Sequence, residues 1–461
     1  MKTKLNPYLK WGGMIQVFLF CLYGAWSISM GNAPDEEMRY QVPYFIFEKG
    51  YLPFGNEIEI RNGIWGFSYA YTPYLPSIIA VGFMRIFSLF TMSQDILFFS
   101  SRLVSVISVA ITWLMCCKIG ERIFRNQIMI LLLAVLVCFL PQFIFLGSYL
   151  NNDAFAVMVS GFIIYLWIKG DQENWKYSDC VLLGISLGLC ALTYFNAYGF
   201  ILCSIIFCLT SVIKKKMSMK EIMIRVGIVF FSAFIVAGWF FIRNMILHNG
   251  DFLGMKTMYA DGEMYALDIY KPTQRSTPKN LNYGFSKTFL ESTFSSLNWF
   301  TSSWFSFIGC FGYMAYSLPL IEYILYTVLI VLGFISGFII LCVTPNNKMN
   351  RISRNLFINL CLSIFIPAIL SMYYSWATDY QPQGRYIISC LIPLMIIVTY
   401  GYDKLFNRLI RKWNLNWVIL LIIIGYLLLF NYAYWVQLIP NCHDSINYTT
   451  PNMLNIIKMY R

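Results

Sequence analysis

The chain has 461 residues, of which 58% are hydrophobic and 12% are charged, and its mean hydropathy is +0.61. Many apolar runs of about 20 residues, the length of a membrane-spanning helix, divide the sequence. This composition excludes a soluble globular protein and predicts one all-α polytopic membrane domain, residues 1–461. The net charge of +12 would suit nucleic-acid binding only if the basic residues formed one polar surface.

The 13 cysteines stand mostly singly in apolar runs, as Cys21 and Cys138 do. The adjacent pair Cys116 and Cys117 has no metal-ligand spacing. We therefore interpret the cysteines as small hydrophobic residues, with neither a disulfide framework nor a zinc site.

The first apolar run, residues 12–30, follows a short basic start and has no small-residue cleavage site after it. It is therefore predicted to be a retained membrane anchor and not a removed signal peptide. Directly after it come Pro34, Asp35, Glu36 and Glu37. Such carboxylates are ordinary at a helix N-terminus, where they cap the backbone and suit the helix dipole. Alternatively, acids at a membrane boundary belong to a functional site.

Residues 73–91 form an apolar run whose membrane placement decides the topology. If this run crossed the membrane, every later basic cluster would lie outside. Arg85 in its middle and Pro76 near its start favour a helix that lies in the interface. We therefore predict that it does not span, so that residues 31–95 form a first external loop with juxtamembrane helices.

The remaining apolar runs are predicted spans, which makes about eleven transmembrane helices in all. They cover residues 96–117, 127–147, 153–168, 180–194, 197–213, 226–246, 319–343, 356–374, 387–402 and 417–436. The two runs around residues 193–196 could instead form one re-entrant hairpin. We predict that the protein lies in the plasma membrane, with a cytoplasmic N-terminus and an external C-terminus.

The basic clusters agree with this orientation. They centre on Arg122, Lys215, Arg351 and Arg408, and all fall on the cytoplasmic side. This is the positive-inside pattern of membrane proteins, so the net charge gives no support to nucleic-acid binding.

A second external loop is predicted at residues 248–318. It opens with polar residues and becomes rich in Phe, Trp and Ser over residues 285–313. Because aromatic residues favour the headgroup level, we expect helices that lie on the membrane there. The chain shows no short-period repeat and no P-loop, GxGxxG or HExxH motif.

Four polar motifs fall at outward ends of the predicted spans. They contain Asp35 and Glu36, Asn152 and Asp153, Arg243 and Asn244, and Gln383 to Tyr386. Each one alone is most simply a helix cap or a snorkelling side chain. Together, acids and arginines on one membrane surface suit transfer from a lipid-linked phosphate. Cations hold the phosphate leaving group, and a carboxylate takes the proton of an acceptor hydroxyl.

With these motifs the chain resembles the GT-C class of membrane glycosyltransferases, which take sugars from polyprenyl phosphate on the outer face. The class includes protein O-mannosyltransferases and the lipid A aminoarabinose transferase. The resemblance rests on Asp35-Glu36 after the first span and on Pro141 with Asn152-Asp153 before the fourth. The late motifs Asn298…Phe311-Gly312-Tyr313 and Gln383-Gly384-Arg385-Tyr386 are similar to an uncharacterised bacterial branch. That branch commonly has a His where this chain has Arg39.

The resemblance implies a role for three acids. Asp35 would be the general base or would orient the acceptor, Glu36 would support it, and Asp153 would be a second acid lining the site. If a divalent cation takes part, Asp35 and Asp153 are its candidate ligands. The implied donor is a polyprenyl-phosphate-linked sugar, used with inversion. The implied acceptor is a cell-envelope glycan, lipid or protein beside membrane lipid.

The resemblance does not say which cation holds the donor phosphate. Arg385 and Arg243 are the first candidates, and Arg85 and Arg61 are weaker ones. Three other classes remain open: a lipid-linked sugar flippase or transporter, a polysaccharide polymerase or ligase, and a non-catalytic assembly scaffold. A transporter would carry charges near the bilayer midplane and usually a repeat. A polymerase would have its main external loop late in the chain.

Overall fold

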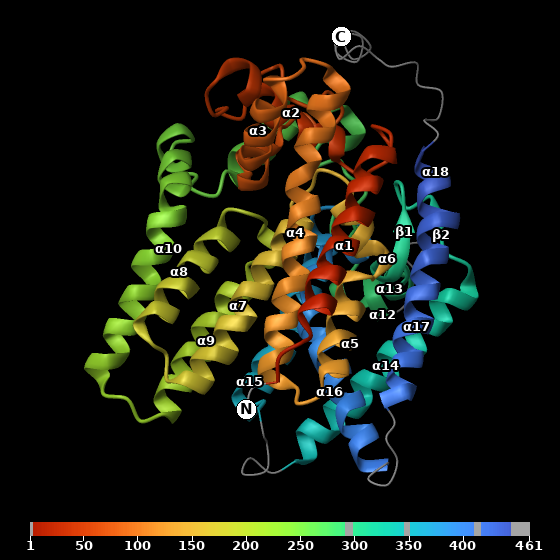
Figure 1. Cartoon of the computed structure of the whole chain (residues 1–461). Helices are drawn as coiled ribbons and strands as arrows, with labels where there is room; N and C mark the ends of the chain where they lie inside the picture. The colour runs from red at the N-terminus through yellow and green to blue at the C-terminus, as the bar shows by residue number, and fades with distance from the viewer. Residues whose placement is uncertain (1–2, 291–297, 345–350, 410–415, 444–461) are drawn as a thin grey trace.

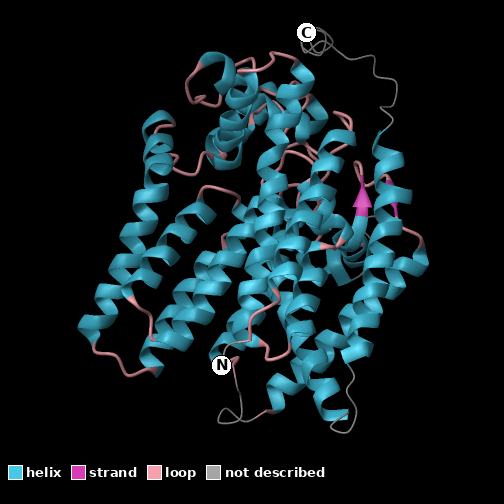
Figure 2. Cartoon of the chain, viewed as in Figure 1, coloured by secondary structure: helices cyan, strands magenta, loops and turns pink. Residues whose placement is uncertain are grey.

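The structure, a computed structural model, describes residues 3–290, 298–344, 351–409 and 416–443. Almost all of their regular secondary structure is helical (Figure 2). Long helices form one bundle, with α2 (Glu36–Lys49) and α3 (Leu75–Ser88) gathered at the upper end in Figure 1. The start of α1 (Pro7–Ser27) lies at the opposite end, so the chain crosses the bundle once before it enters the first predicted loop.

Every predicted span corresponds to a helix or a bent helix pair. After α1, these are α4 (Gln94–Ile123), α5 (Gln127–Cys138) with α6 (Pro141–Gly147), α7 (Asp153–Glu173), α8 (Tyr177–Ala191), α9 (Gly199–Lys214), α10 (Met219–Leu247), α14 (Leu320–Val343), α15 (Arg354–Ala377), α16 (Leu391–Leu409) and α17 (Asn416–Tyr432). The protein is thus an all-α polytopic membrane protein, as its composition predicts.

Within the described ranges, eight helices are long and apolar enough to cross a membrane, or nine if the pair α5–α6 is one span. The other two predicted spans, α1 and α8, are not among them. Helix α8 has only 15 residues, about 22 Å of helix against a hydrocarbon core of about 30 Å. The interfacial prediction for residues 73–91 agrees with α3, whose 14 residues are also too few to cross.

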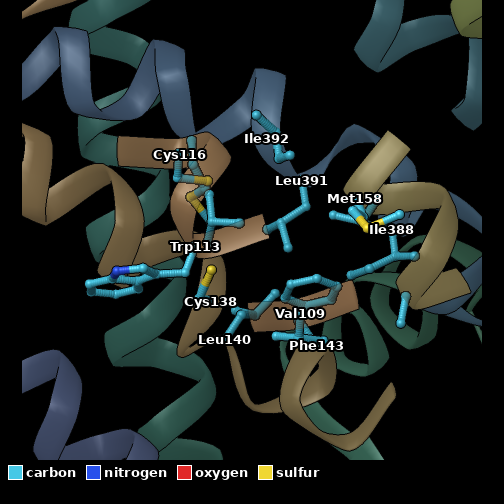
Figure 3. Packing of buried hydrophobic residues seen from close by; sticks show 14 of the residues in the cluster. Val109, Trp113, Cys116, Cys138, Leu140, Phe143, Met158, Ile388, Leu391 and Ile392 are labelled. Carbon is cyan, nitrogen blue, oxygen red and sulfur yellow. The ribbon is translucent and has the colours of Figure 1, made fainter. Parts of the chain in front are cut away.

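The core of the bundle is formed by α4, α7 and α16. In an apolar stretch of 18 residues, 83% is buried in α7 and in Gly384–Phe406, the segment that contains most of α16. In α10 the corresponding share is 17%. The apolar side chains of α10 therefore face outward, as they would toward lipid. Figure 3 shows Trp113, Cys138, Phe143 and Leu391 packed together in this core. All thirteen cysteines are free, which agrees with their interpretation as small hydrophobic residues.

Pairs of glycines four residues apart bring two helix pairs into close contact. A Cβ atom on Gly184 or Gly188 of α8 would lie within 3 Å of backbone oxygens of α10. On α14, a Cβ on Gly337 would lie 2.2 Å from a carbonyl of α16. These are the small-residue contacts by which membrane helices pack backbone to backbone.

Two local features depart from continuous helix. At Pro141 the predicted span 127–147 bends by 63° between α5 and α6, because proline cannot continue the preceding helix. In the aromatic stretch, α12 (Phe285–Leu290) and α13 (Trp299–Gly309) agree with the expected helices. They are followed by a small antiparallel hairpin, β1 (Cys310–Phe311) and β2 (Tyr316–Ser317), which the sequence did not predict.

Basic residues at the ends of several predicted spans lie near one another, at the end of the bundle where α1 begins. Lys10 pairs with Glu121 at 3.2 Å and Arg122 with Glu173 at 2.9 Å. Arg351 donates to the carbonyl of Phe124 at 3.0 Å. The predicted cytoplasmic clusters around Arg122 and Arg351 therefore lie together, at the end of the bundle opposite α2 and α3.

Candidate active site

Asp35 lies in the turn between α1 and α2. Its backbone is left-handed, with φ 61° and ψ 1°, a conformation that Asp tolerates better than most residues. It occupies the N-cap position of α2, yet its side chain makes no capping hydrogen bond. Instead, its Oδ2 accepts a hydrogen bond from Nη2 of Arg385 at 2.7 Å. The helix-cap interpretation therefore does not describe this carboxylate.

Arg385 reaches Asp35 from η5 (Gly384–Cys390), the short helix before α16. Gly384 packs so closely on α13 that a Cβ there would lie 2.1 Å from the amide nitrogen of Phe307. Only glycine allows this approach. Nε of Arg385 donates to Gln383 at 2.7 Å, which holds the guanidinium toward Asp35. The residues of the late motif thus act together to place one arginine.

Arg39, one turn after Asp35 on α2, supplies a second cation. It is 6% exposed, and its guanidinium lies 4.3 Å from the ring of Tyr69 and 5.8 Å from that of Tyr194. Within the described part of the chain its side chain makes no hydrogen bond or ion pair, and Nε is buried without a partner. A buried cation without such contacts is costly unless a ligand completes its surroundings.

Asp153 begins α7 and is 1% exposed. The turn before it is fixed by Asn151, whose Oδ1 accepts from the amide of Ala154 at 2.9 Å, and by Asn152, which donates to Thr193 at 2.8 Å. Oδ1 of Asp153 is buried without a hydrogen-bond partner among the described residues. Its carboxylate interacts with the charges of Arg385, Arg39 and Asp35. Asp153 therefore belongs to the same group of charges.

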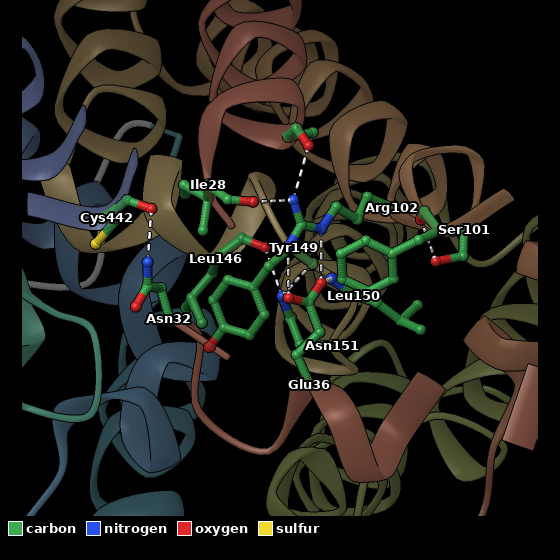
Figure 4. Close-up of polar contacts among 12 residues, drawn as sticks. Ile28, Asn32, Glu36, Ser101, Arg102, Leu146, Tyr149, Leu150, Asn151 and Cys442 are labelled. Atoms are coloured by element: carbon green, nitrogen blue, oxygen red, sulfur yellow. Dashed lines mark hydrogen bonds and ion pairs between the residues drawn. The ribbon is translucent and has the colours of Figure 1, made fainter. Parts of the chain in front are cut away.

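Glu36 has different surroundings from those of Asp35. It is fully buried and accepts two hydrogen bonds from Arg102 of α4, at 2.8 and 2.6 Å (Figure 4). Its Oε1 also accepts from the amide of Leu150 at 2.8 Å. Arg102 in turn donates to the carbonyls of Ala25 and Ile28. Glu36 thus joins α1, α2, α4 and the turn before α7, and supports Asp35 by fixing the elements around it.

The electrostatics of the site favour an ionised Asp35. Burial acts to raise the pKa of Asp35, but Arg385, Arg39 and a hydrogen bond from Tyr69 outweigh it and lower that pKa. Burial acts to lower the pKa of Arg39, but Tyr69, Tyr194 and the two aspartates raise it. Both groups are therefore charged at neutral pH. Such an arrangement can bind an anion at the arginines and accept a proton at a carboxylate.

These residues do not fit a metal site. In the described residues no group of three or more His, Cys, Asp or Glu side chains is placed to hold an ion. One oxygen of Asp35 is already bound by Arg385, and Arg39 adds positive charge beside the two aspartates. We therefore derive no step through a divalent cation.

The other three arginines predicted to bind phosphate are held by backbone carbonyls elsewhere. Arg243 donates to Leu52 and Pro53 at 3.0 and 2.7 Å. Arg85 donates to the carbonyl of Phe47. Arg61 donates to Asn56 at 3.2 Å, and its guanidinium lies 3.7 Å from the ring of Tyr265. Of the four, only Arg385 is paired with Asp35.

Sequence reasoning missed Arg102 and the tyrosines around the site. A charged residue inside the apolar run 96–117 was a usable indication for Arg102, because such residues usually have a partner. Tyr69, Tyr194 and Tyr386 had no comparable indication, because interfacial tyrosines are common in membrane proteins.

Residues 57–398 match the family DUF2142, described as predicted membrane proteins. The chain belongs to this family. The matched segment includes Asp153 and Arg385 and begins after Asp35. A search of curated proteins found no match.

Solved structures of lipid-linked glycan transferases are similar in fold. The archaeal oligosaccharyltransferase AglB from Archaeoglobus fulgidus, in complex with an inhibitory peptide and a dolichol-phosphate, matches with a TM-score of 0.54 and 11% identity over 99% of this chain. The chain spans 60% of the length of AglB. ArnT from Cupriavidus metallidurans, bound to undecaprenyl phosphate, matches with a TM-score of 0.52 and 11% identity, covering 99% of this chain and 76% of ArnT. These matches confirm a GT-C-like polytopic membrane fold.

Proposed function

We propose that this protein is a membrane glycosyltransferase that moves a sugar from a polyprenyl-phosphate-linked donor to an acceptor on the outer face of the plasma membrane. The observation that carries the proposal is the meeting of Asp35 with two buried arginines, Arg385 and Arg39, on a GT-C-like fold. The similarity of AglB and ArnT, whose structures contain dolichol-phosphate and undecaprenyl phosphate, supports a lipid-phosphate donor.

In the proposed reaction, an acceptor hydroxyl attacks the anomeric carbon of the donor sugar from the side opposite the phosphate. The new bond joins the acceptor oxygen to this carbon, and the bond from the carbon to the phosphate oxygen breaks with inversion. The hydroxyl proton passes to Asp35, with Asp153 as the second acid of the site. Arg385 and Arg39 hold the phosphate as it gains charge. Glu36 positions this site through Arg102.

The proposed orientation follows from the charges at the two ends of the bundle. Basic residues at the ends of several spans lie near the start of α1, and the positive-inside rule therefore supports a cytoplasmic N-terminus. The turn between α1 and α2, which contains Asp35, lies at the other end of the bundle, the end that we assign to the outer face. The loops 31–95 and 248–318 would then be external and would meet the acceptor.

Incubation of the purified protein with defined polyprenyl-phosphate sugars tests the proposal. Donor consumption with release of polyprenyl phosphate is the expected result, and it should be absent with Asp35→Asn. The proposal fails if no donor in a panel of neutral, amino and acidic sugars is consumed by folded protein in the presence of membrane glycans and lipids as acceptors.

A further inference from the structure

A cavity of about 260 Å³ lies between the two predicted external loops, beyond the site described above. Its lining includes Phe54 and Asn56 of the first loop, Tyr71 of η1 (Tyr69–Tyr71), His248 and Asn249 after α10, and Asp261 of α11 (Met255–Tyr265). Small-molecule pockets typically measure about 300–1,000 Å³. At about 260 Å³ this cavity lies just below that range, and it has room for one small molecule.

The polar groups of this cavity are only partly used within the chain. Tyr71 donates to Oδ2 of Asp261, and Oδ1 has no hydrogen bond among the described residues. Nε2 of His248 is buried without a partner, and the imidazole ring lies 5.2 Å from the ring of Tyr71. The side-chain amides of Asn56 and Asn249 also make no hydrogen bond to the described residues. Asn56 and Asn249 are exposed and could bind a ligand as readily as water, whereas the buried Nε2 of His248 lacks a partner, which indicates that a bound molecule supplies one.

The lining excludes two classes of ligand. It contains no Lys or Arg, and its one carboxylate repels anions, so a phosphate is disfavoured. Only one His and one Asp line it, and the described residues hold no group of three or more ligands for a metal. What remains is a set of uncharged hydrogen-bonding groups and one carboxylate, Asp261, beside two aromatic rings, Phe54 and Tyr71. Such a surface contacts the hydroxyls and the C–H face of a polyhydroxylated ring.

We propose that this cavity binds one neutral sugar residue of a glycan. The site is linked to the charged one by η1, because Tyr69 on this short helix lies against Arg39 while Tyr71 lines the cavity. Asn244 of α10 fixes the turn by donating to the carbonyl of Tyr71 at 3.1 Å. The identification of the bound sugar as part of the acceptor glycan rests on the proposed function. The inference that the cavity binds a sugar rests only on the residues that line it.

Saturation-transfer NMR on the full chain in nanodiscs tests this binding. The probes are methyl glycosides of neutral hexoses and N-acetylhexosamines, compared with a hexose 6-phosphate and with ethanolamine. At least one neutral glycoside should bind. Asn249→Gly and Asp261→Asn should each weaken it about tenfold, as expected for the loss of one hydrogen bond to the bound sugar.

Asn282→Gly is the matched control. Asn249 and Asn282 both have a left-handed backbone, with φ of 50° and 59°, but only Asn249 lines the cavity. The control should bind the glycoside normally. The inference is overturned if no neutral glycoside binds, if only the phosphate or the amine binds, or if Asn249→Gly and Asp261→Asn bind as the control does. Asp35→Asn should keep sugar binding, so a failure of the transfer reaction is distinguishable from a failure of this site.

Discussion

Replacing Glu36 by Gln should destabilise the protein strongly, although it changes only one oxygen for an NH₂ group. Arg102 is 1% exposed and Glu36 is fully buried, so the substitution leaves a guanidinium in the interior without its counter-ion. Removing one partner of a buried ion pair typically costs about 3–5 kcal/mol. The free energy of unfolding, measured by denaturant titration in detergent with tryptophan fluorescence, should fall by about that amount.

Glu37→Gln is the matched control, because Glu37 is the next residue on α2 and is exposed. Its effect should be within about 0.5 kcal/mol. Combining Glu36→Gln with Arg102→Met should recover part of the loss, because the buried charge is then removed as well. The reasoning is refuted if Glu36→Gln is as stable as Glu37→Gln. If that stable variant also lost transfer, Glu36 would be a reacting group and not a positioning one.

Four further outcomes follow from the same structure. Asp35→Asn should lower transfer about 10²–10⁴-fold and should destabilise the protein less than Glu36→Gln does, because the Asp35 side chain is 32% exposed and that of Glu36 is fully buried; near-normal turnover would show that this carboxylate is not the base. Because the pKa of Asp35 is lowered, its ion pair with Arg385 should persist as the pH falls to about 3.9, the usual Asp value, and the stability that the pair contributes should be lost only below that pH; a difference in the free energy of unfolding between the wild type and Asp35→Asn that disappears between pH 7 and 5 would contradict this. Arg385→Lys should stay impaired in donor binding or transfer, because an ammonium cannot replace the guanidinium fork, whereas activity within a few-fold of normal would assign only an anchoring role. Cysteines introduced at Asn56 and Gln94 should react with an impermeant thiol reagent from outside, and labelling of either only from the cytoplasm would contradict the proposed topology.

The membrane fold could largely be predicted from sequence, because the length and hydropathy of a span are local properties. The bend at Pro141 follows equally from local chemistry. The hairpin at Cys310–Phe311 could not be found in this way, because strands of two residues leave no alternating pattern. The glycine pair Gly184 and Gly188 was a usable indication of close helix packing, but it does not name the partner helix.

For the site, the sequence could predict only that its residues lie at one membrane surface, and not which of them contact each other. Motif order placed Asp35 and Arg385 at one membrane surface, but a contact across 350 positions leaves no local pattern. The different roles of Asp35 and Glu36 depend on the left-handed backbone at Asp35, which turns two adjacent carboxylates toward different arginines. Arg39 was noticed only as a departure from the family pattern, and its burial between two tyrosine rings depends on tertiary packing.

The ion pair between Asp35 and Arg385 affects both the base and the leaving group of the proposed transfer. A base held by an arginine is a weaker base, because the cation favours the ionised form. When the acceptor proton reaches Asp35, however, its negative charge disappears, and the leaving phosphate gains one negative charge in the same step. Arg385 can then exchange one anion for the other while Arg39 remains charged beside both. The total charge of the site is unchanged during the reaction, so a buried site need not stabilise any net charge separation. The ion pair that weakens the base thus also supplies the cation that the leaving group requires.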